Sequence, residues 1–211
     1  MLNAGVLSFR EFVMHEPLPL ATLHEAVLQF LRGRADIAVF GAHAVNAYTS
    51  EPRMTQDVDV MALHAAGLAE ELRNHLTQKF HIAVRVREVA EGKGFRLYQV
   101  QKTGNRHLVD VRAIKQVPVT RTFEEINILA PTELIASKVV SYQARRGKPK
   151  SGTDWRDLAM LLLAFPELKS EAGPVYDLLC SLGVSAVVLE VWRELALTEL
   201  QNVAEDDDLA W

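Results

Sequence analysis

The sequence contains a single cysteine, Cys180, and no long run of apolar residues. One cysteine cannot form an intramolecular disulfide, so we expect a reducing compartment. The apolar stretches are far shorter than the ~20 residues that a transmembrane helix needs. Segment 1–17 lacks a basic start and carries Arg10 and Glu11 within its apolar run, unlike a secretory signal peptide. These absences predict a cytoplasmic protein that is not inserted in a membrane.

The chain also lacks an excess of positive charge. Its formal net charge is −4 over 211 residues, which gives no global attraction to nucleic acid but permits a local basic groove. The composition, 49% hydrophobic and 24% charged, is typical of globular domains. A chain of this length can bury a full core. We therefore expect one large or two small globular domains.

Hydrophobic periodicity divides the chain near Ala130. Up to that residue the patterns predict helices at 20–31, 42–48 and 68–80, and strands at 36–40, 57–61, 82–89, 95–102, 107–114 and 123–129. From Pro131, a residue suited to the first turn of a helix, the pattern is helical, with breaks at 147–152, Pro166, Gly173 and Gly183. We predict an α/β (α+β) domain over residues 1–130, a helical domain over 131–204 and a solvated, disordered acidic tail over 205–211.

Three aspartates lie on predicted strands. Asp57 and Asp59 are two residues apart, so they share one face of a strand, roughly 7 Å apart at their Cα atoms. Asp110 lies in an alternating segment, where we expect Leu108 on the same face, and a neighbouring strand would bring Asp110 beside the first two. Carboxylates so close together repel each other unless a cation lies between them, and oxygen ligands favour Mg²⁺. The alternative is that Asp57 and Asp59 lie on the solvent-exposed face of an edge strand and bind no metal.

A small-residue turn precedes these aspartates. Gly41-Ala42 follows a short buried strand pattern and opens a segment of small residues. Glycine lets the backbone approach a ligand closely, and the first N–H groups of a helix bind phosphate. The turn and the carboxylates together predict a phosphate site beside a metal site.

The helical half carries a lysine and two further aspartates. Lys138 lies on the apolar stripe of its predicted helix, so its stem can be buried while its ammonium faces a cleft. Asp154 and Asp157 are three residues apart and share one face of the next helix, where Asp157 can orient Lys138. Alternatively, Lys138 is an ordinary snorkelling lysine, and Asp154 only complements the helix dipole, with Ser151 or Thr153 as the cap.

In chain order, Gly41-Ala42, Asp57-x-Asp59 and Asp110 resemble the motif of the nucleotidyltransferase superfamily, which has a DNA polymerase beta-like fold. The stretch Arg53–Asp59 is similar to the AbiEii toxin-like branch, as is a lysine (Lys138) followed on the next helix by Asp154-x-x-Asp157. The resemblance covers residues 39–163. The sequence departs from the pattern at Ala42, where the family has Gly or Ser, and in the long spacing from Gly41 to Asp57.

The resemblance implies a mixed sheet with flanking helices, and an enzyme that moves a nucleoside monophosphate from an NTP to a hydroxyl acceptor with release of pyrophosphate. It implies two Mg²⁺ ions and an RNA acceptor such as the 3′ end of tRNA, in a toxin–antitoxin pair with an antitoxin protein partner. The implied metal ligands are Asp57, Asp59 and Asp110. Catalytic roles fall to these three, with Asp110 as general base, and to Lys138 and Asp157. Nucleotide binding falls to Gly41, Ala42, Arg53, Thr55 and Lys138.

The alternative function is a non-catalytic nucleotide- or partner-binding module on the same fold, motivated by Ala42 and the long spacing. We interpret Trp155 and Trp192 as packing residues and Cys180 as a core residue. We interpret His43 as a packed or surface histidine, with contact to a ligand as the alternative. The histidines, including His107, show no metal-ligand spacing. The basic segment 145–150 is typical of a solvated loop, and phosphate binding is its alternative.

Overall fold

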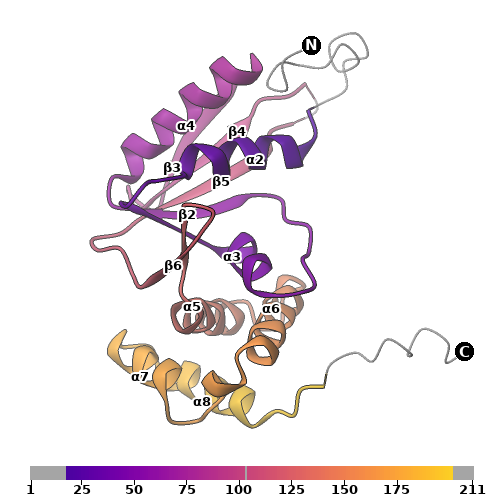
Figure 1. The fold of residues 1–211 in the computed structure, drawn as a ribbon, viewed down its shortest axis with the longest axis vertical. Helices are drawn as coiled ribbons and strands as arrows, with labels where there is room; N and C mark the ends of the chain where they lie inside the picture. The colour runs from indigo at the N-terminus through magenta and orange to yellow at the C-terminus, as the bar shows by residue number, and fades with distance from the viewer. Residues whose placement is uncertain (1–17, 103, 202–211) are drawn as a thin grey trace, which may run out of the picture. The chain divides into compact units, whose positions relative to one another are not determined.

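The computed structural model describes residues 18–102 and 104–201 (Figure 1). The acidic tail predicted at 205–211 and segment 1–17 lie outside the described residues. Two compact units make up the structure: one contains the described residues up to Ala44 together with Arg53–Leu129, and the other contains Val45–Pro52 and the described residues from Ala130 onward. Within the described ranges, no helix is both long enough and apolar enough to cross a bilayer.

A seven-stranded mixed sheet forms the first unit, in the order β3-β4-β5-β2-β1-β7-β6. β2 runs parallel to β5 and β1 runs parallel to β7, and the other neighbours are antiparallel. This mixed sheet with flanking helices confirms the predicted fold class. The strands are β1 (Ile37–Phe40), β2 (Val58–Ala62), β3 (Val84–Val89), β4 (Gly94–Gln99), β5 (Arg106–Ala113), β6 (Thr120–Phe123) and β7 (Ile126–Leu129).

Helices α2 (Leu20–Leu31) and α4 (Ala65–Phe80) lie along the same face of the sheet (Figure 1). The alternation in β2 explains why: its three apolar residues Val58, Val60 and Ala62 are fully buried, whereas Asp59 and Met61 between them are half-buried. A buried aliphatic side chain stabilises the fold by roughly 2 kcal/mol, so the helices pack on the apolar face. The opposite face is left to polar side chains.

The second unit is helical. Its helices are α5 (Pro131–Ala144), α6 (Lys150–Ala164), α7 (Pro174–Ser181) and α8 (Ala186–Leu197), with a short 3₁₀ turn at Pro166–Leu168. Trp192 is fully buried, and its Nε1 donates a hydrogen bond to the Ser170 carbonyl at 3.1 Å. The predicted packing role of Trp192 and the predicted start of α5 at Pro131 are therefore confirmed. Helix α3 (Gly41–Tyr48) connects β1 with the loop before β2.

The strand predicted over residues 123–129 is confirmed only at Ile126–Leu129, which is β7; Phe123 instead ends β6, the antiparallel strand before it. Glu124 and Glu125 join them, and both have positive φ, 45° and 66°. Positive φ is uncommon outside glycine, and glutamate is not a typical turn residue. The sequence therefore gives no local signal for this hairpin. The pairing of the two strands supplies the constraint instead.

Three interpretations of the helical unit also need correction. Cys180 is exposed, because Val175 and Leu179 form the buried stripe of α7 and Cys180 follows one position later. Trp155 is 43% exposed and is not a core residue. Helix α6 begins at Lys150, inside the break that was predicted at 147–152. Ser151 and Thr153 therefore lie within the helix and cannot cap it.

Candidate active site

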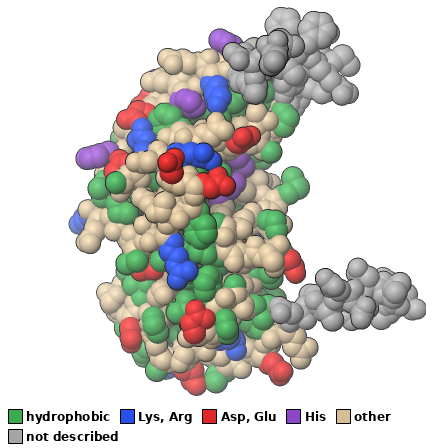
Figure 2. Space-filling model, viewed as in Figure 1, with side chains coloured by type: hydrophobic (Ala, Val, Ile, Leu, Met, Phe, Trp, Pro, Cys, Tyr) green, Lys and Arg blue, Asp and Glu red, His purple; other side chains and the backbone are tan. Residues whose placement is uncertain are grey.

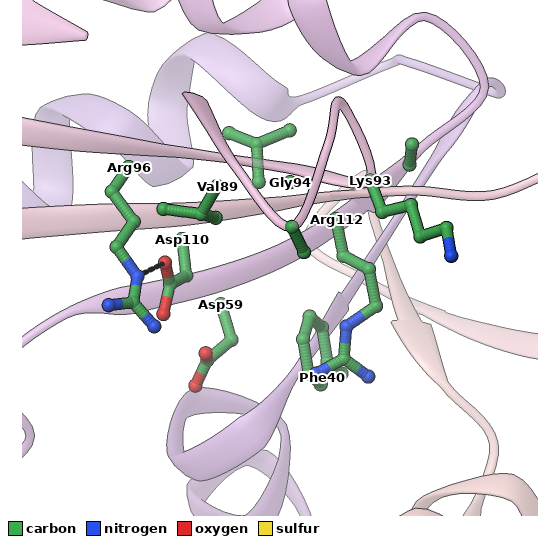
Figure 3. Close-up of a pocket in the computed structure, with 11 residues that line it drawn as sticks. Phe40, Asp59, Val89, Lys93, Gly94, Arg96, Asp110 and Arg112 are labelled. Carbon is green, nitrogen blue, oxygen red and sulfur yellow. Dashed lines mark hydrogen bonds and ion pairs between the residues drawn. The ribbon is translucent and has the colours of Figure 1, made fainter. Parts of the chain in front are cut away.

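A row of side chains crosses four strands on the polar face of the sheet. Asp59 of β2 is in register with Asp110 of β5, and Asp110 is in register with Arg96 of β4. On the other side, Phe40 of β1 is opposite Asp59. Residues in register on strands about 4.8 Å apart point to the same face. The two carboxylates, far apart in the sequence, therefore lie side by side, as Figure 3 shows.

A β-bulge in β5 places His107 beside these carboxylates. The pairing of β4 and β5 shifts between Leu97, which is opposite Val109, and Tyr98, which is opposite His107. A bulge adds one residue to a strand and turns the side chains beyond it to the other face. Leu108 is fully buried, so the prediction that it shares a face with Asp110 is wrong. His107 takes that place.

His107 contacts two of the aspartates. Its Nδ1 lies 3.0 Å from Oδ2 of Asp57, the residue that immediately precedes β2. Its Nε2 lies 3.5 Å from Oδ1 of Asp110, and its ring stacks on Tyr98 with centroids 5.0 Å apart. One ligand atom from each of Asp57, His107 and Asp110 lies within 4.8 Å of the others. Two carboxylates and an imidazole are a donor set that suits a divalent cation.

These contacts change the protonation of the cluster. Burial alone would lower the pKa of His107, but Asp110 and Asp57 outweigh it and raise the pKa to about 9. Burial alone would raise the pKa of Asp110, but His107 and then Arg96 lower it below its ordinary value. Arg96 Nε also donates a hydrogen bond to Asp110 Oδ1 at 2.9 Å. A protonated His107 can therefore stand between the carboxylates where a metal ion would neutralise them.

We predict that this cluster makes the stability of the metal-free protein fall at alkaline pH. The pKa of His107 is about 9 in the fold against an ordinary value of 6.5, so its contribution is full below pH 6.5 and is lost as the pH rises through 9. Urea unfolding in EDTA at a pH below 6.5 and at one above 9 measures the difference. In His107→Asn, the difference between the free energies of unfolding at the two pH values should be much smaller.

His43 provides the control for this prediction. Burial lowers its pKa to about 4, so it is neutral throughout the alkaline range and His43→Asn should keep the wild-type pH dependence. Equal pH dependence in wild type and His107→Asn would contradict the prediction. His43 packs edge-on against His24, with ring centroids 5.1 Å apart, which agrees with its interpretation as a packing residue.

Gly41, the first residue of α3, lies directly against Asp59. Its φ is +67°, and a Cβ built on it would lie 1.9 Å from Asp59 Oδ2 and 2.6 Å from Asp59 Cγ. Only glycine fits such a position without strain. The first turn of α3 therefore begins beside the carboxylate, with backbone N–H groups that have no partner within the helix. Ala42 is buried in that turn, and its methyl group is accommodated there.

The loop before β2 is held by its own side chains. Thr55 Oγ1 donates a hydrogen bond to the carbonyl of Asp57 at 3.0 Å, which holds the backbone where the carboxylate strand starts. Arg53 Nη1 donates to the carbonyl of Met54 at 3.2 Å. Thr55 thus positions the loop in this structure, and the nucleotide binding expected of Arg53 and Thr55 stays a prediction.

A cavity of about 410 Å³ opens beside the carboxylates, within the first unit. Its lining includes two acidic side chains, Asp59 and Asp110, and three basic ones, Lys93, Arg96 and Arg112. The Arg112 guanidinium lies over the Phe40 ring, 4.7 Å from its centroid. In Figure 3 the two carboxylates lie between Arg96 on one side and Arg112 on the other. The cavity thus offers both signs of charge to a ligand.

In the second unit, Lys138 and Asp157 form a buried ion pair. Lys138 Nζ donates a hydrogen bond to Asp157 Oδ2 at 2.6 Å and lies 3.8 Å from Asp154 Oδ1. Arg145 Nη1 donates to both oxygens of Asp154, at 3.1 and 2.8 Å. The predicted contact of Asp157 with Lys138 is therefore present. Asp154 is buried and paired, so its interpretation as a helix-dipole residue near a cap is wrong.

We predict that Asp157→Asn lowers the free energy of unfolding by about 2 kcal/mol, because a charge-assisted hydrogen bond disappears and a buried ammonium keeps only a neutral partner. Urea denaturation measures the change. The control is Glu190→Gln, which removes an exposed partner of Arg193 in the same unit and should leave the free energy of unfolding nearly unchanged. Equal losses of stability in both variants would mean that the buried pair contributes no more than an exposed one.

The fold is similar to those of solved structures that include a putative nucleotidyltransferase and a polyadenylate synthase. JHP933 from Helicobacter pylori matches with a TM-score of 0.55 at 14% identity, over 90% of both chains. A putative nucleotidyltransferase from H. pylori matches with a TM-score of 0.52 at 13% identity, over 90% of this chain and 93% of that one. The Megavirus polyadenylate synthase matches with a TM-score of 0.55 at 14% identity, over 70% of this chain; the matched part is 32% of the synthase.

No protein-family model matches the sequence, and no curated protein matches it either. The similarity is thus one of fold, and it confirms the nucleotidyltransferase-like architecture that the motifs predicted. The assignment to the AbiEii branch stays a prediction, as do the catalytic roles of the individual residues.

Proposed function

We propose that this protein is a metal-dependent nucleotidyltransferase that moves a nucleoside monophosphate from an NTP to a hydroxyl acceptor and releases pyrophosphate. One observation supports the proposal above the others: Asp59 and Asp110 lie side by side on neighbouring strands, and the N-terminus of a helix begins against Asp59. A carboxylate pair for cations next to backbone N–H groups that lack a partner within their helix is what transfer from a triphosphate requires.

The side chains on this face fit a divalent metal. Asp57, Asp59 and Asp110 are the proposed ligands of two Mg²⁺ ions, and His107 is a further candidate because its imidazole lies beside the oxygens of Asp57 and Asp110. When bound, such ions neutralise charge on the phosphates and make an acceptor hydroxyl more acidic. The contribution of His107 was not visible in the sequence, because its place depends on the bulge in β5.

The protein's own groups do the positioning. The first N–H groups of α3, at Gly41 and Ala42, are proposed to bind the triphosphate, and Thr55 holds the loop that leads to Asp57. Asp110 is proposed to accept the proton of the acceptor hydroxyl. Its pKa lies below the ordinary value, so it is ionised and able to accept a proton at neutral pH.

The remaining roles follow from the family resemblance alone. They are triphosphate binding by Lys138 and Arg53, an RNA acceptor such as the 3′ end of tRNA, a toxin–antitoxin context and a cytoplasmic location. The ion pair of Lys138 with Asp157 is compatible with a structural role as well. These roles are therefore tested after the transfer reaction itself.

The test is a transfer assay with each of the four NTPs labelled at the α-phosphate, in the presence of Mg²⁺ or Mn²⁺. Total tRNA, a single-stranded RNA and the protein itself serve as acceptors. Labelled acceptor with stoichiometric pyrophosphate would establish the activity. Calorimetric NTP binding without transfer to any acceptor would instead support the non-catalytic module, for which Ala42 and the long spacing from Gly41 to Asp57 argue.

A further inference from the structure

The polar face of the three outer strands is basic. On β3, Arg85 is opposite Tyr98, and Arg87 is opposite Arg96. The same rows continue to His107 and to Asp110 on β5. Since residues in register share a face, Arg85 and Arg87 point to the face that carries the carboxylates. Both arginines are exposed.

Two further cations lie on the cavity wall, Lys93 and Arg112. We call these five residues the basic face: Arg85, Arg87, Lys93, Arg96 and Arg112. Arg96 is paired with Asp110. Among the described residues, none of the other four takes part in an ion pair. Four cations without acidic partners are therefore available to an anionic ligand.

This clustering is local. The chain carries a net charge of −4, and on the side shown in Figure 2 acidic and basic side chains are interspersed. An unpaired group of like charges in an acidic protein costs repulsion energy, which a bound anion removes. Because the cluster lies beside Asp110, its position indicates which of the two substrates this anion is.

The row of paired residues separates two ends of the site. At the β1 end it finishes at Phe40, and Gly41 follows with the helix N-terminus proposed for the triphosphate. At the β3 end it finishes at Arg87, two strands or about 10 Å from Asp110. A ligand bound along Arg85 and Arg87 therefore approaches Asp110 from the side opposite to the triphosphate. That is the side from which an acceptor must come.

We propose that the β3 end of the basic face, at Arg85 and Arg87, binds the acceptor, and that the acceptor is single-stranded RNA. Its backbone phosphates contact Arg85 and Arg87, and its terminal hydroxyl reaches Asp110 next to the cavity. Tyr98 lies between Arg85 and His107 in the same row, and basic side chains interleaved with an aromatic ring are typical of single-strand binding. A polycationic acceptor is disfavoured by the same charges. This inference rests on the proposed transfer function.

The test measures binding of a fluorescein-labelled oligouridylate to the full chain by anisotropy, in EDTA and without NTP. We expect binding that weakens with salt. The variant R85Q/R87Q should bind about tenfold more weakly, and its slope of log affinity against log salt should fall by ~0.7 for each phosphate that is no longer neutralised. The control R73Q/K79Q removes the same charge from α4, which covers the other face of the sheet, and should bind as wild type does.

The transfer assay separates acceptor from nucleotide. R85Q/R87Q should raise KM for the RNA acceptor and leave KM for the NTP unchanged. Equal RNA binding by R85Q/R87Q and wild type would overturn the inference, as would stronger competition by a polyglutamate peptide than by unlabelled RNA. Transfer to another acceptor without RNA binding would refute it and leave the proposed function standing. RNA binding that requires the two arginines, without any NMP transfer, would refute only the proposed function.

Discussion

Asp59→Asn and Asp110→Asn are each expected to lower the rate of NMP transfer by about 10³-fold, equivalent to ~4 kcal/mol of transition-state stabilisation. The reason is the loss of one anionic oxygen ligand from the pair on β2 and β5, which leaves the charge that develops on the phosphates poorly neutralised. Asparagine keeps the size of the side chain, so the sheet should still form. Release of labelled pyrophosphate from an NTP labelled at the γ-phosphate, under single-turnover conditions, measures the rate.

The matched control is Glu88→Gln, also a carboxylate-to-amide change in the same sheet. Glu88 lies on β3 next to Arg87, and neighbouring residues of a strand point to opposite faces, so Glu88 faces away from the site. Its variant should transfer at the wild-type rate. Circular dichroism and thermal melting confirm that each variant is folded. A rate within tenfold of wild type in both aspartate variants would refute the metal role proposed for these carboxylates.

Gly41→Ala should be nearly as damaging, although it changes no charge. A Cβ at this position would lie 1.9 Å from Asp59 Oδ2, so the carboxylate or the start of α3 must move. Either movement separates the carboxylate from the backbone N–H groups beside it, and we expect transfer to slow by about 10²-fold or more, as for other removals of a positioned group. The positive φ adds about 1–2 kcal/mol of strain to the folded state.

Gly33→Ala separates these two effects. Gly33 also has a positive φ, +72°, but a Cβ there would meet nothing within 4 Å. It should therefore carry the same backbone strain and lose stability by about 1–2 kcal/mol, yet keep its transfer rate. Urea unfolding and the transfer assay measure both quantities. Comparable activity in the two alanine variants would show that the contact of Gly41 with Asp59 has no part in the reaction.

Local features of the sequence were sufficient for much of the fold. The helix at Leu20–Leu31 was predicted with its observed bounds, because apolar side chains recur with helical spacing and Gly33 follows. The contact of Lys138 with Asp157 was predicted because spacing on a helix fixes which face a side chain takes. The helical periodicity and the face that each side chain takes are short-range properties, although the contact itself forms only when α5 and α6 pack.

Other features depended on strand pairing and packing, which no local pattern encodes. The hairpin of β6 and β7 turns at Glu124 and Glu125, residues that carry no turn signal, because the ladder on either side imposes their conformation. Exposed Cys180 and Trp155 belong to the same class, since an apolar residue in a helix is buried only if a neighbour covers its face. No local pattern contains that information.

By itself, the sequence determined which residues were available for chemistry: Asp59 on a strand with Asp57 directly before it, a glycine turn upstream, and Asp110 on a later strand. Only the tertiary structure decided how they combine. The parallel register of β2 and β5 places Asp59 against Asp110, the bulge brings His107 among them, and the β3–β4 hairpin adds Arg85 and Arg87 to the same face. The physical reason is that alternation assigns a side chain to one of two faces, while strand pairing decides which neighbours it meets there.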